Sequence, residues 1–409
     1  MALKNVEMKS SEILQKLNYM YNNNLKLQEM GITPIAMQIE GHAGLGKTSL
    51  VRQFCNDHEL QFVKINLSML DELSDLVGFP IKQHLMCKKN VQRKDLFSYV
   101  DESDDTIWVN ESATSQFVNN GYIFTGETRT TYAPPEWIAN KGDNGILLLD
   151  DWNRADQRFI QACMELINEQ TYYSWKLPKG WTIILTSNPD DGTYMVNEMD
   201  DAVKSRFITF DMRFDINDWM KWAEAIGISD TCINFLALNP DIIGKDKSIN
   251  PRSMSMFFNS IRSIDDFQKT ENLSTMQLLA QASVGPEVAS MFTAFVHNKL
   301  DKLITPKEVM EMDFDKMCEK FKGSTGKDDN YRADIASIIA RRTVNYMREY
   351  VKTNKLNDKI MTRIKDIIKS DLLTNDLIYM FASDMYDIDN NKFKPMILDV
   401  KVAQIIMKR

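Results

Sequence analysis

A short run of residues has the types and spacing needed to hold the phosphates of a nucleoside triphosphate. It fits the pattern G-x-x-x-x-G-K-[ST] at every fixed position: Gly41, His42, Ala43, Gly44, Leu45, Gly46, Lys47 and Thr48. Glycines let backbone N–H groups curl around phosphates, the Lys47 ammonium reaches the β- and γ-phosphates, and the Thr48 hydroxyl ligates Mg²⁺. The apolar run 35–39 precedes the pattern and a helix-like stretch begins at Ser49, whose helix amino terminus adds partial positive charge. The sequence therefore predicts a nucleotide site at residues 41–49, and this setting disfavours the alternative of a plain glycine turn.

A second candidate site follows the apolar run 146–149, which ends in the adjacent carboxylates Asp150 and Asp151. Asp150 is predicted to hold Mg²⁺ through its water shell, and Asp151 to orient the water that attacks the terminal phosphate. The alternative is a buried strand end followed by an exposed acidic turn without a chemical role. Together with the phosphate loop, the two carboxylates predict a site for Mg²⁺ and a nucleotide.

Strand and helix signals alternate over the first half of the chain. Strands are predicted at 35–39, 61–67, 145–149 and 181–186, and helices at 9–30, 49–58 and 156–169. This alternation indicates the α/β class, with a parallel sheet covered by helices on both faces. The pattern turns irregular between about 81 and 143, which we interpret as an insertion with a hairpin around residues 122–124.

Strand signals nearly vanish after residue 210, so the rest of the chain is predicted to be helical. Helices are expected at 216–227, 251–264, 274–299, 330–353 and 357–372. The expected domains are an N-terminal helix (1–30), an α/β nucleotide-binding domain (31–212) with the insertion at 81–143, a helical domain (213–320) and a helical C-terminal extension (321–409).

The composition excludes several classes of protein. The chain has 409 residues and a net charge of −8, which gives no general attraction to nucleic acid or an anionic membrane. Its 5 cysteines are scattered without a Cys-x-x-Cys pair, which argues against a disulfide framework or a zinc site. No apolar stretch has the length of a membrane span or the character of a signal peptide, so we expect a soluble, cytoplasmic protein without a membrane partner.

Further short motifs follow the phosphate loop in a recognisable order. They are D-D-W-N-R-A at 150–155, T-S-N-P at 186–189, A-V-K-S-R-F at 202–207 and N-P-R at 250–252. In this order they resemble the motifs of MoxR-type AAA+ ATPases over residues 35–260. The resemblance implies a P-loop AAA+ domain followed by an all-α lid, with ATP and Mg²⁺ as cofactors. The runs A-P-P-E-W at 133–137 and K-L-P-K-G-W at 176–181 resemble a bacterial and phage subgroup often found beside von Willebrand A-type proteins.

The resemblance also implies individual roles for residues outside the phosphate loop. Asn188 matches a sensor of the γ-phosphate, Arg206 an arginine finger that enters the neighbouring subunit's site, and Arg252 a second sensor on the lid. The implied catalytic residues are Lys47, Asp151, Asn188 and Arg206. An arginine supplied in trans implies a homo-oligomeric ring, a hexamer as in related ATPases. For each arginine the alternative is an ordinary surface salt bridge.

One position departs from the family pattern. Asp151 stands where the family has Glu, and its carboxylate is one methylene shorter. A loss of about 1 Å in reach can lower a rate on the order of a hundredfold. Three outcomes stay open: the Asp151 backbone shifts to compensate, Asp151 acts through an extra water, or the protein hydrolyses slowly and serves as a nucleotide-gated switch.

The sequence leaves open what the nucleotide drives. The resemblance favours remodelling or activation of a partner protein, including one with a von Willebrand A-like domain. A nucleic-acid-stimulated motor is the second hypothesis, for which the only local support is the basic cluster Lys88, Lys89, Arg93 and Lys94; a solvated face is favoured there. A nucleotide-switched scaffold is the third. Phe79 either grips a substrate from a pore loop or lies buried at a Gly-Pro turn.

Overall fold

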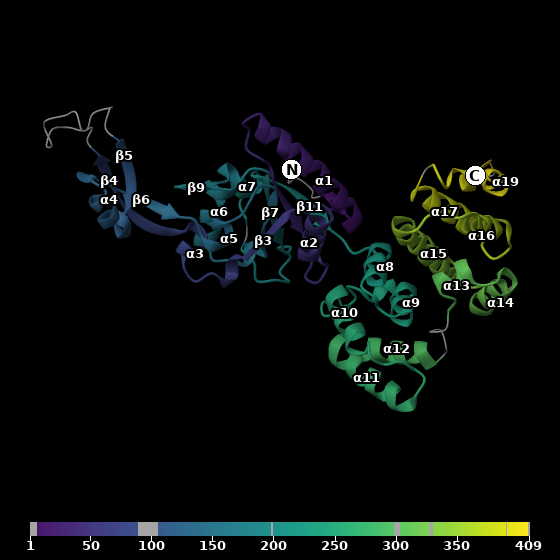
Figure 1. The fold of residues 1–409 in the computed structure, drawn as a ribbon. Coiled ribbons are helices and arrows are strands. Elements are labelled where there is room, and N and C mark those ends of the chain that lie inside the picture. Colours follow the sequence, from purple (N-terminus) through teal and green to yellow (C-terminus); the bar gives the residue numbers. More distant parts are fainter. Residues whose placement is uncertain are drawn as a thin grey trace. The chain divides into compact units, whose positions relative to one another are not determined.

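The computed structural model describes residues 6–88, 105–197, 199–297, 303–326, 330–389 and 391–407. The chain divides into two compact units, Met1–Arg213 and Phe214–Arg409 (Figure 1). Within the described ranges, no helix is both long and apolar enough to cross a membrane. Of the basic cluster considered above, only Lys88 falls within the described residues.

The first unit is built on a six-stranded parallel sheet. In spatial order its strands are β1 (Val6–Met8), β11 (Phe207–Met212), β2 (Ala36–Glu40), β10 (Trp181–Ser187), β7 (Gly145–Asp150) and β3 (Gln61–Asn66). Every residue of β7 and β10 is buried. Burial on both faces favours apolar side chains at successive positions, which is why residues 146–149 of β7 and 183–185 of β10 form continuous apolar runs. The predicted α/β class with a parallel sheet is confirmed.

Helices cover both faces of this sheet. On one face α1 (Ser10–Glu29) and α2 (Lys47–Asp57) pack Leu17 and Phe54 against Ile39 and Leu148. On the other face α6 (Gln157–Glu169) and α3 (Leu73–Val77) pack around a core centred on the fully buried Trp152. Shorter elements complete the unit: α5 (Glu136–Ala139), α7 (Asp201–Lys204), β8 (Thr171–Tyr172), β9 (Trp175–Lys176), and the 3₁₀ turns Leu67–Met69, Glu111–Ala113 and Trp152–Arg154.

The insertion is more regular than its sequence predicts. It forms a three-stranded antiparallel sheet of β4 (Phe79–Lys88), β5 (Asp105–Asn110) and β6 (Ile123–Ala133), with α4 (Thr114–Asn119) beside it (Figure 1). The prediction of a local hairpin around residues 122–124 is wrong, because Phe124 pairs with Met86 of β4, a strand that lies far away in the sequence. Most of β6 is exposed and polar. A strand with no buried face lacks the alternating apolar pattern on which recognition from sequence depends.

The second unit is helical throughout its regular elements. Its first core holds α8 (Ile216–Ala225), α9 (Asp230–Leu238), the 3₁₀ turn Pro240–Ile242, α10 (Pro251–Ser260), α11 (Thr270–Val284) and α12 (Pro286–His297). Its second core holds α13 (Pro306–Glu311), α14 (Phe314–Thr325), α15 (Ala333–Thr353), α16 (Asp358–Lys369), α17 (Asn375–Tyr386), α18 (Lys394–Ile397) and α19 (Val400–Met407). The prediction of a single helix over 274–299 is wrong, because Gly285 at φ 88° and the proline after it separate α11 from α12.

Candidate nucleotide site

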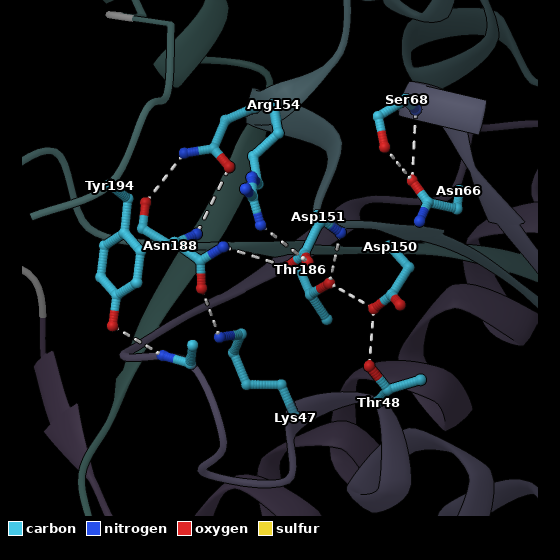
Figure 2. Close-up of polar contacts among 12 residues, drawn as sticks. Lys47, Thr48, Asn66, Ser68, Asp150, Asp151, Arg154, Thr186, Asn188 and Tyr194 are labelled. Atoms are coloured by element: carbon cyan, nitrogen blue, oxygen red, sulfur yellow. Dashed lines mark hydrogen bonds and ion pairs between the residues drawn. The ribbon is translucent and has the colours of Figure 1, made fainter. Parts of the chain in front are cut away.

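The candidate site lies at the carboxyl edge of the parallel sheet. The strands β2, β10 and β7 are neighbours, and their ends carry Gly41, Asn188 and Asp150 respectively. Figure 2 shows Asn188 and Asp150 close to Lys47 and Thr48. Because parallel strands end at the same edge, segments more than a hundred residues apart in sequence meet there. The phosphate loop, the paired carboxylates and the predicted sensor are therefore brought together.

The phosphate loop depends on glycine for its shape. A Cβ on Gly41 would lie 2.8 Å from the backbone oxygen of Met212, too close for any other residue. Gly46 caps α2 in the left-handed conformation, at φ 91°. The helix starts at Lys47, so its first N–H groups point toward the loop as an anion site requires. Ser49 lies exposed in the first turn of this helix.

Lys47 is folded back across its own loop. Its ammonium donates to the carbonyl oxygens of Gly41 and His42, at 2.5 and 3.2 Å, and to the Oδ1 atom of Asn188, at 3.1 Å. The residue is only 7% exposed. These contacts aim the ammonium at the space between the loop and the end of β10, where a terminal phosphate would be neutralised.

Asp150 is a buried carboxylate with three donors. Its Oδ1 atom accepts from the hydroxyls of Thr48 (2.6 Å) and Thr186 (2.7 Å), and its Oδ2 atom pairs with the Lys64 ammonium at 2.8 Å. Burial by itself would raise the pKa of this carboxyl, but the hydrogen bonds from Lys64, Thr48 and Thr186 outweigh it and lower the pKa below its ordinary value. A hydroxyl and an ionised carboxylate are oxygen ligands of the kind Mg²⁺ prefers, so Thr48 and Asp150 fit the predicted metal.

Asp151 occupies an unusual backbone conformation. Its φ is 48°, in the left-handed region, and its N–H donates to the Thr186 hydroxyl at 2.9 Å. The carboxylate accepts from the Asn188 amide at 3.2 Å and lies 4.0 Å from the Arg154 guanidinium. Its side chain is 35% exposed, so water can reach it.

Asn153 is a site residue to which the sequence analysis gave no role. Its amide donates to the Asn188 carbonyl at 2.8 Å and its Oδ1 atom accepts from the Asn188 N–H at 3.3 Å. This pair of bonds fixes the backbone that carries the sensor side chain. The only sequence signal was its place within the run D-D-W-N-R-A.

Tyr194 is a second residue that sequence reasoning did not assign to the site. It lies in the loop after β10, and its hydroxyl accepts from the N–H of Ala43 in the phosphate loop, at 3.0 Å (Figure 2). The same hydroxyl lies 3.4 Å from Nδ1 of His42. The loop after β10 is therefore tied to the start of the phosphate loop, and no spacing rule in the sequence announces this contact.

Of the two predicted arginines, Arg206 lies in the same unit as this cluster but away from it, and Arg252 belongs to the second unit. Arg206 precedes β11, whose first residue Phe207 pairs with Ala36, so it lies at the amino edge of the sheet. It is exposed, donates to the Ala202 carbonyl at 2.6 Å, and lines an open cavity of about 290 Å³. Arg252 is the second residue of α10 in the second unit, where its N–H donates to the Asn250 side chain. Its predicted role as a sensor stays a prediction.

The fold and the site together define a P-loop nucleotide-binding protein of the α/β class. Residues 36–207 match the family model of the AAA domain, dynein-related subfamily. This segment of the chain is therefore an AAA domain, consistent with the strand order and with the phosphate loop at the end of β2.

The chain is also similar to several solved structures, at low sequence identity. No curated protein matches the sequence. Similar solved structures include NtrX from Brucella abortus in complex with ADP, with 11% identity, 86% of this chain and 68% of that chain covered, and a TM-score of 0.33. A candidate ATPase from Cytophaga hutchinsonii has 14% identity, 87% and 92% coverage and a TM-score of 0.31. A RuvB mutant from Thermotoga maritima has 12% identity, 94% and 87% coverage and a TM-score of 0.35.

Proposed function

We propose that the protein is a Mg²⁺-dependent ATP hydrolase of the MoxR type, whose sites are completed between subunits of a ring. The observation that carries the proposal is the chain of contacts from Lys47 through Asn188 to Asp151, beside the Thr48 and Asp150 pair. These are the groups that bind a terminal phosphate, hold its metal and orient a water, gathered at one sheet edge.

Each group has a definite task in this proposal. The phosphate loop and Lys47 bind the β- and γ-phosphates, and Thr48 and Asp150 hold Mg²⁺, which would neutralise charge that develops on the phosphate oxygens. Asp151 orients the attacking water. Asn188 contacts both Lys47 and Asp151, so it is placed to link the state of the γ-phosphate to the position of that carboxylate.

The position of Arg206 supports a site shared between subunits. Lys47 follows the carboxyl end of β2, whereas Arg206 precedes the amino end of the neighbouring strand β11. A strand of this length spans roughly 17 Å, which is farther than one arginine side chain extends. Arg206 therefore acts on the site of a neighbouring subunit, and a hexameric ring follows from the family resemblance.

We further propose that the ring remodels or activates a partner protein, including one with a von Willebrand A-like domain. This part rests on the resemblance of residues 133–137 and 176–181 to that subgroup. Phe79 supports it, because the alternative of a buried phenylalanine is wrong: its side chain is 67% exposed at the start of β4. An exposed aromatic at the base of the insertion is suited to gripping a polypeptide.

The test is steady-state ATP hydrolysis as a function of protein concentration, with light scattering for mass. Activity per chain should rise as rings form, and Lys47→Ala and Arg206→Ala should each abolish it. Lys204→Ala, which removes a neighbouring exposed cation, should keep most of it. ATP binding without turnover in the assembled ring would favour the nucleotide-switched scaffold instead. Strong stimulation by DNA with steep salt dependence would favour the nucleic-acid motor.

A further inference from the structure

Lys64 supplies a positive charge to the candidate site that the roles proposed above do not use. It lies on β3 opposite Leu148, two residues before Asn66, which is opposite Asp150. Its ammonium reaches along the strand to the Oδ2 atom of Asp150, at 2.8 Å. The Lys64 side chain is 37% exposed and the Asp150 side chain 10%, so the pair lies at the border between core and solvent.

The two oxygens of Asp150 serve different partners. Its Oδ1 atom faces the Thr48 hydroxyl, the predicted direct metal ligand, whereas its Oδ2 atom faces the Lys64 ammonium. The Asp150 carboxylate therefore contacts both Lys64, a cation of the protein itself, and Thr48, the residue predicted to ligate Mg²⁺. The ammonium attracts phosphate oxygens and repels a nearby metal ion, and both effects are strongest where solvent is partly excluded.

We propose that Lys64 is a positioning residue that acts as a built-in counter-cation: it holds Asp150 in place without metal and lowers the dependence of nucleotide binding on Mg²⁺. The inference rests on the proposed function, since it concerns the same site. Without Lys64, the nucleotide loses a nearby positive charge in the absence of metal, while Mg²⁺ meets less repulsion. Both changes make nucleotide binding more dependent on Mg²⁺.

The test compares the affinity of a fluorescent ADP analogue in Mg²⁺ and in EDTA, which needs no turnover. In Lys64→Met, the ratio of the Kd in EDTA to the Kd in Mg²⁺ should rise at least about fivefold above the wild-type ratio. In Lys64→Arg, which keeps the charge, the ratio should stay near wild type. Lys64→Gln, which keeps a hydrogen-bond donor without charge, should behave as Lys64→Met does.

Each outcome is decisive. A wild-type ratio in both uncharged variants would overturn the inference, while normal nucleotide binding by the wild-type protein would leave the proposed function intact. A wild-type protein that does not bind the analogue would overturn the nucleotide site itself, and the inference with it. If Lys64→Met does not fold, the polar variant Lys64→Gln gives the same comparison.

Discussion

The side-chain amide of Asn188 connects the two ends of the candidate reaction centre. Its oxygen accepts from Lys47 and its nitrogen donates to Asp151, so the two partners require opposite ends of the amide and fix its orientation. Asn153 holds the Asn188 backbone at both its N–H and its carbonyl group. A phosphate that draws Lys47 toward itself would change the partner that holds Asn188, and Asn188 would pass this change to Asp151.

Asp151 should decide turnover without deciding nucleotide affinity. Asp151→Asn removes the charge that orients water, and kcat should fall about a hundredfold or more, while the nucleotide Kd stays within about threefold of wild type. Asp151→Glu keeps the carboxylate and lengthens its reach by one methylene, and the partly exposed position of the Asp151 side chain leaves room for it. The glutamate variant should therefore stay within about tenfold of wild type.

Single-turnover and steady-state hydrolysis, together with equilibrium binding of the nucleotide, separate these effects. If Asp151→Asn hydrolysed ATP at the wild-type rate, the Asp151 carboxylate would have no role in the reaction.

At the scale of elements, the first part of the second unit is joined to α15 by a buried cation. Arg342 on α15 is 3% exposed and donates to Glu224 of α8 at 2.9 Å, to Asn234 of α9 at 2.8 Å, and to Asp230. Burial raises the pKa of the Glu224 carboxyl, and the Arg342 charge partly opposes that shift. Helices α8, α9 and α15 therefore share a polar contact, and removal of one partner should lower the free energy of unfolding.

Arg342→Met should destabilise the protein by about 3–5 kcal/mol, because the half-buried Glu224 loses its cation and the buried Asn234 loses a hydrogen-bond donor. The defect should shrink as pH falls. A carboxyl whose pKa is higher in the folded than in the unfolded state stabilises the fold at a pH below its unfolded pKa. This contribution to stability is lost as the pH rises through the folded pKa. Without Arg342 the pKa of Glu224 rises further, so the variant gains more stability from acid than the wild type does.

Denaturant unfolding at pH 7.5 and pH 5 measures this difference. The matched control is Arg332→Ala, which breaks an exposed ion pair with Asp334 and should cost less than about 1 kcal/mol at either pH. The account would be contradicted if Arg342→Met lowered the free energy of unfolding no more than the control substitution does. It would also be contradicted if this loss were larger at pH 5 than at pH 7.5.

The burial pattern of each element explains whether the sequence predicted it. Strand β7 and helix α6 were found because their apolar patterns match buried faces. Strand β1 was missed because its three residues carry too little pattern, and strand β6 was missed because it has no buried face and so lacks the alternating apolar pattern. Lys47 and Asp150 were predicted from contiguous motifs. Lys64 and Tyr194 were not, because only strand register and a loop conformation bring them to the site.

At the scale of the whole molecule, the proposed reaction machinery is divided between opposite edges of one sheet. Lys47 follows the carboxyl end of β2, and Arg206 precedes the amino end of β11. A subunit that carries both residues still cannot bring them together, so the account requires that neighbouring subunits complete each other's sites. A head-to-tail arrangement of identical subunits closes into a ring when its rotation allows.

Complementation between two inactive variants tests this claim most directly. Lys47→Ala and Arg206→Ala subunits would be mixed before assembly, and ATP hydrolysis measured once light scattering shows rings. Each variant alone should be inactive. In an equal mixture that assembles at random, about a quarter of the interfaces should be active, namely those at which an intact Lys47 site faces an intact Arg206.

The control replaces the Arg206→Ala subunit with one that carries both substitutions, and this mixture should stay inactive. Mixed rings of the two single variants that hydrolyse no ATP, or an Arg206→Ala protein as active as wild type, would contradict the shared site.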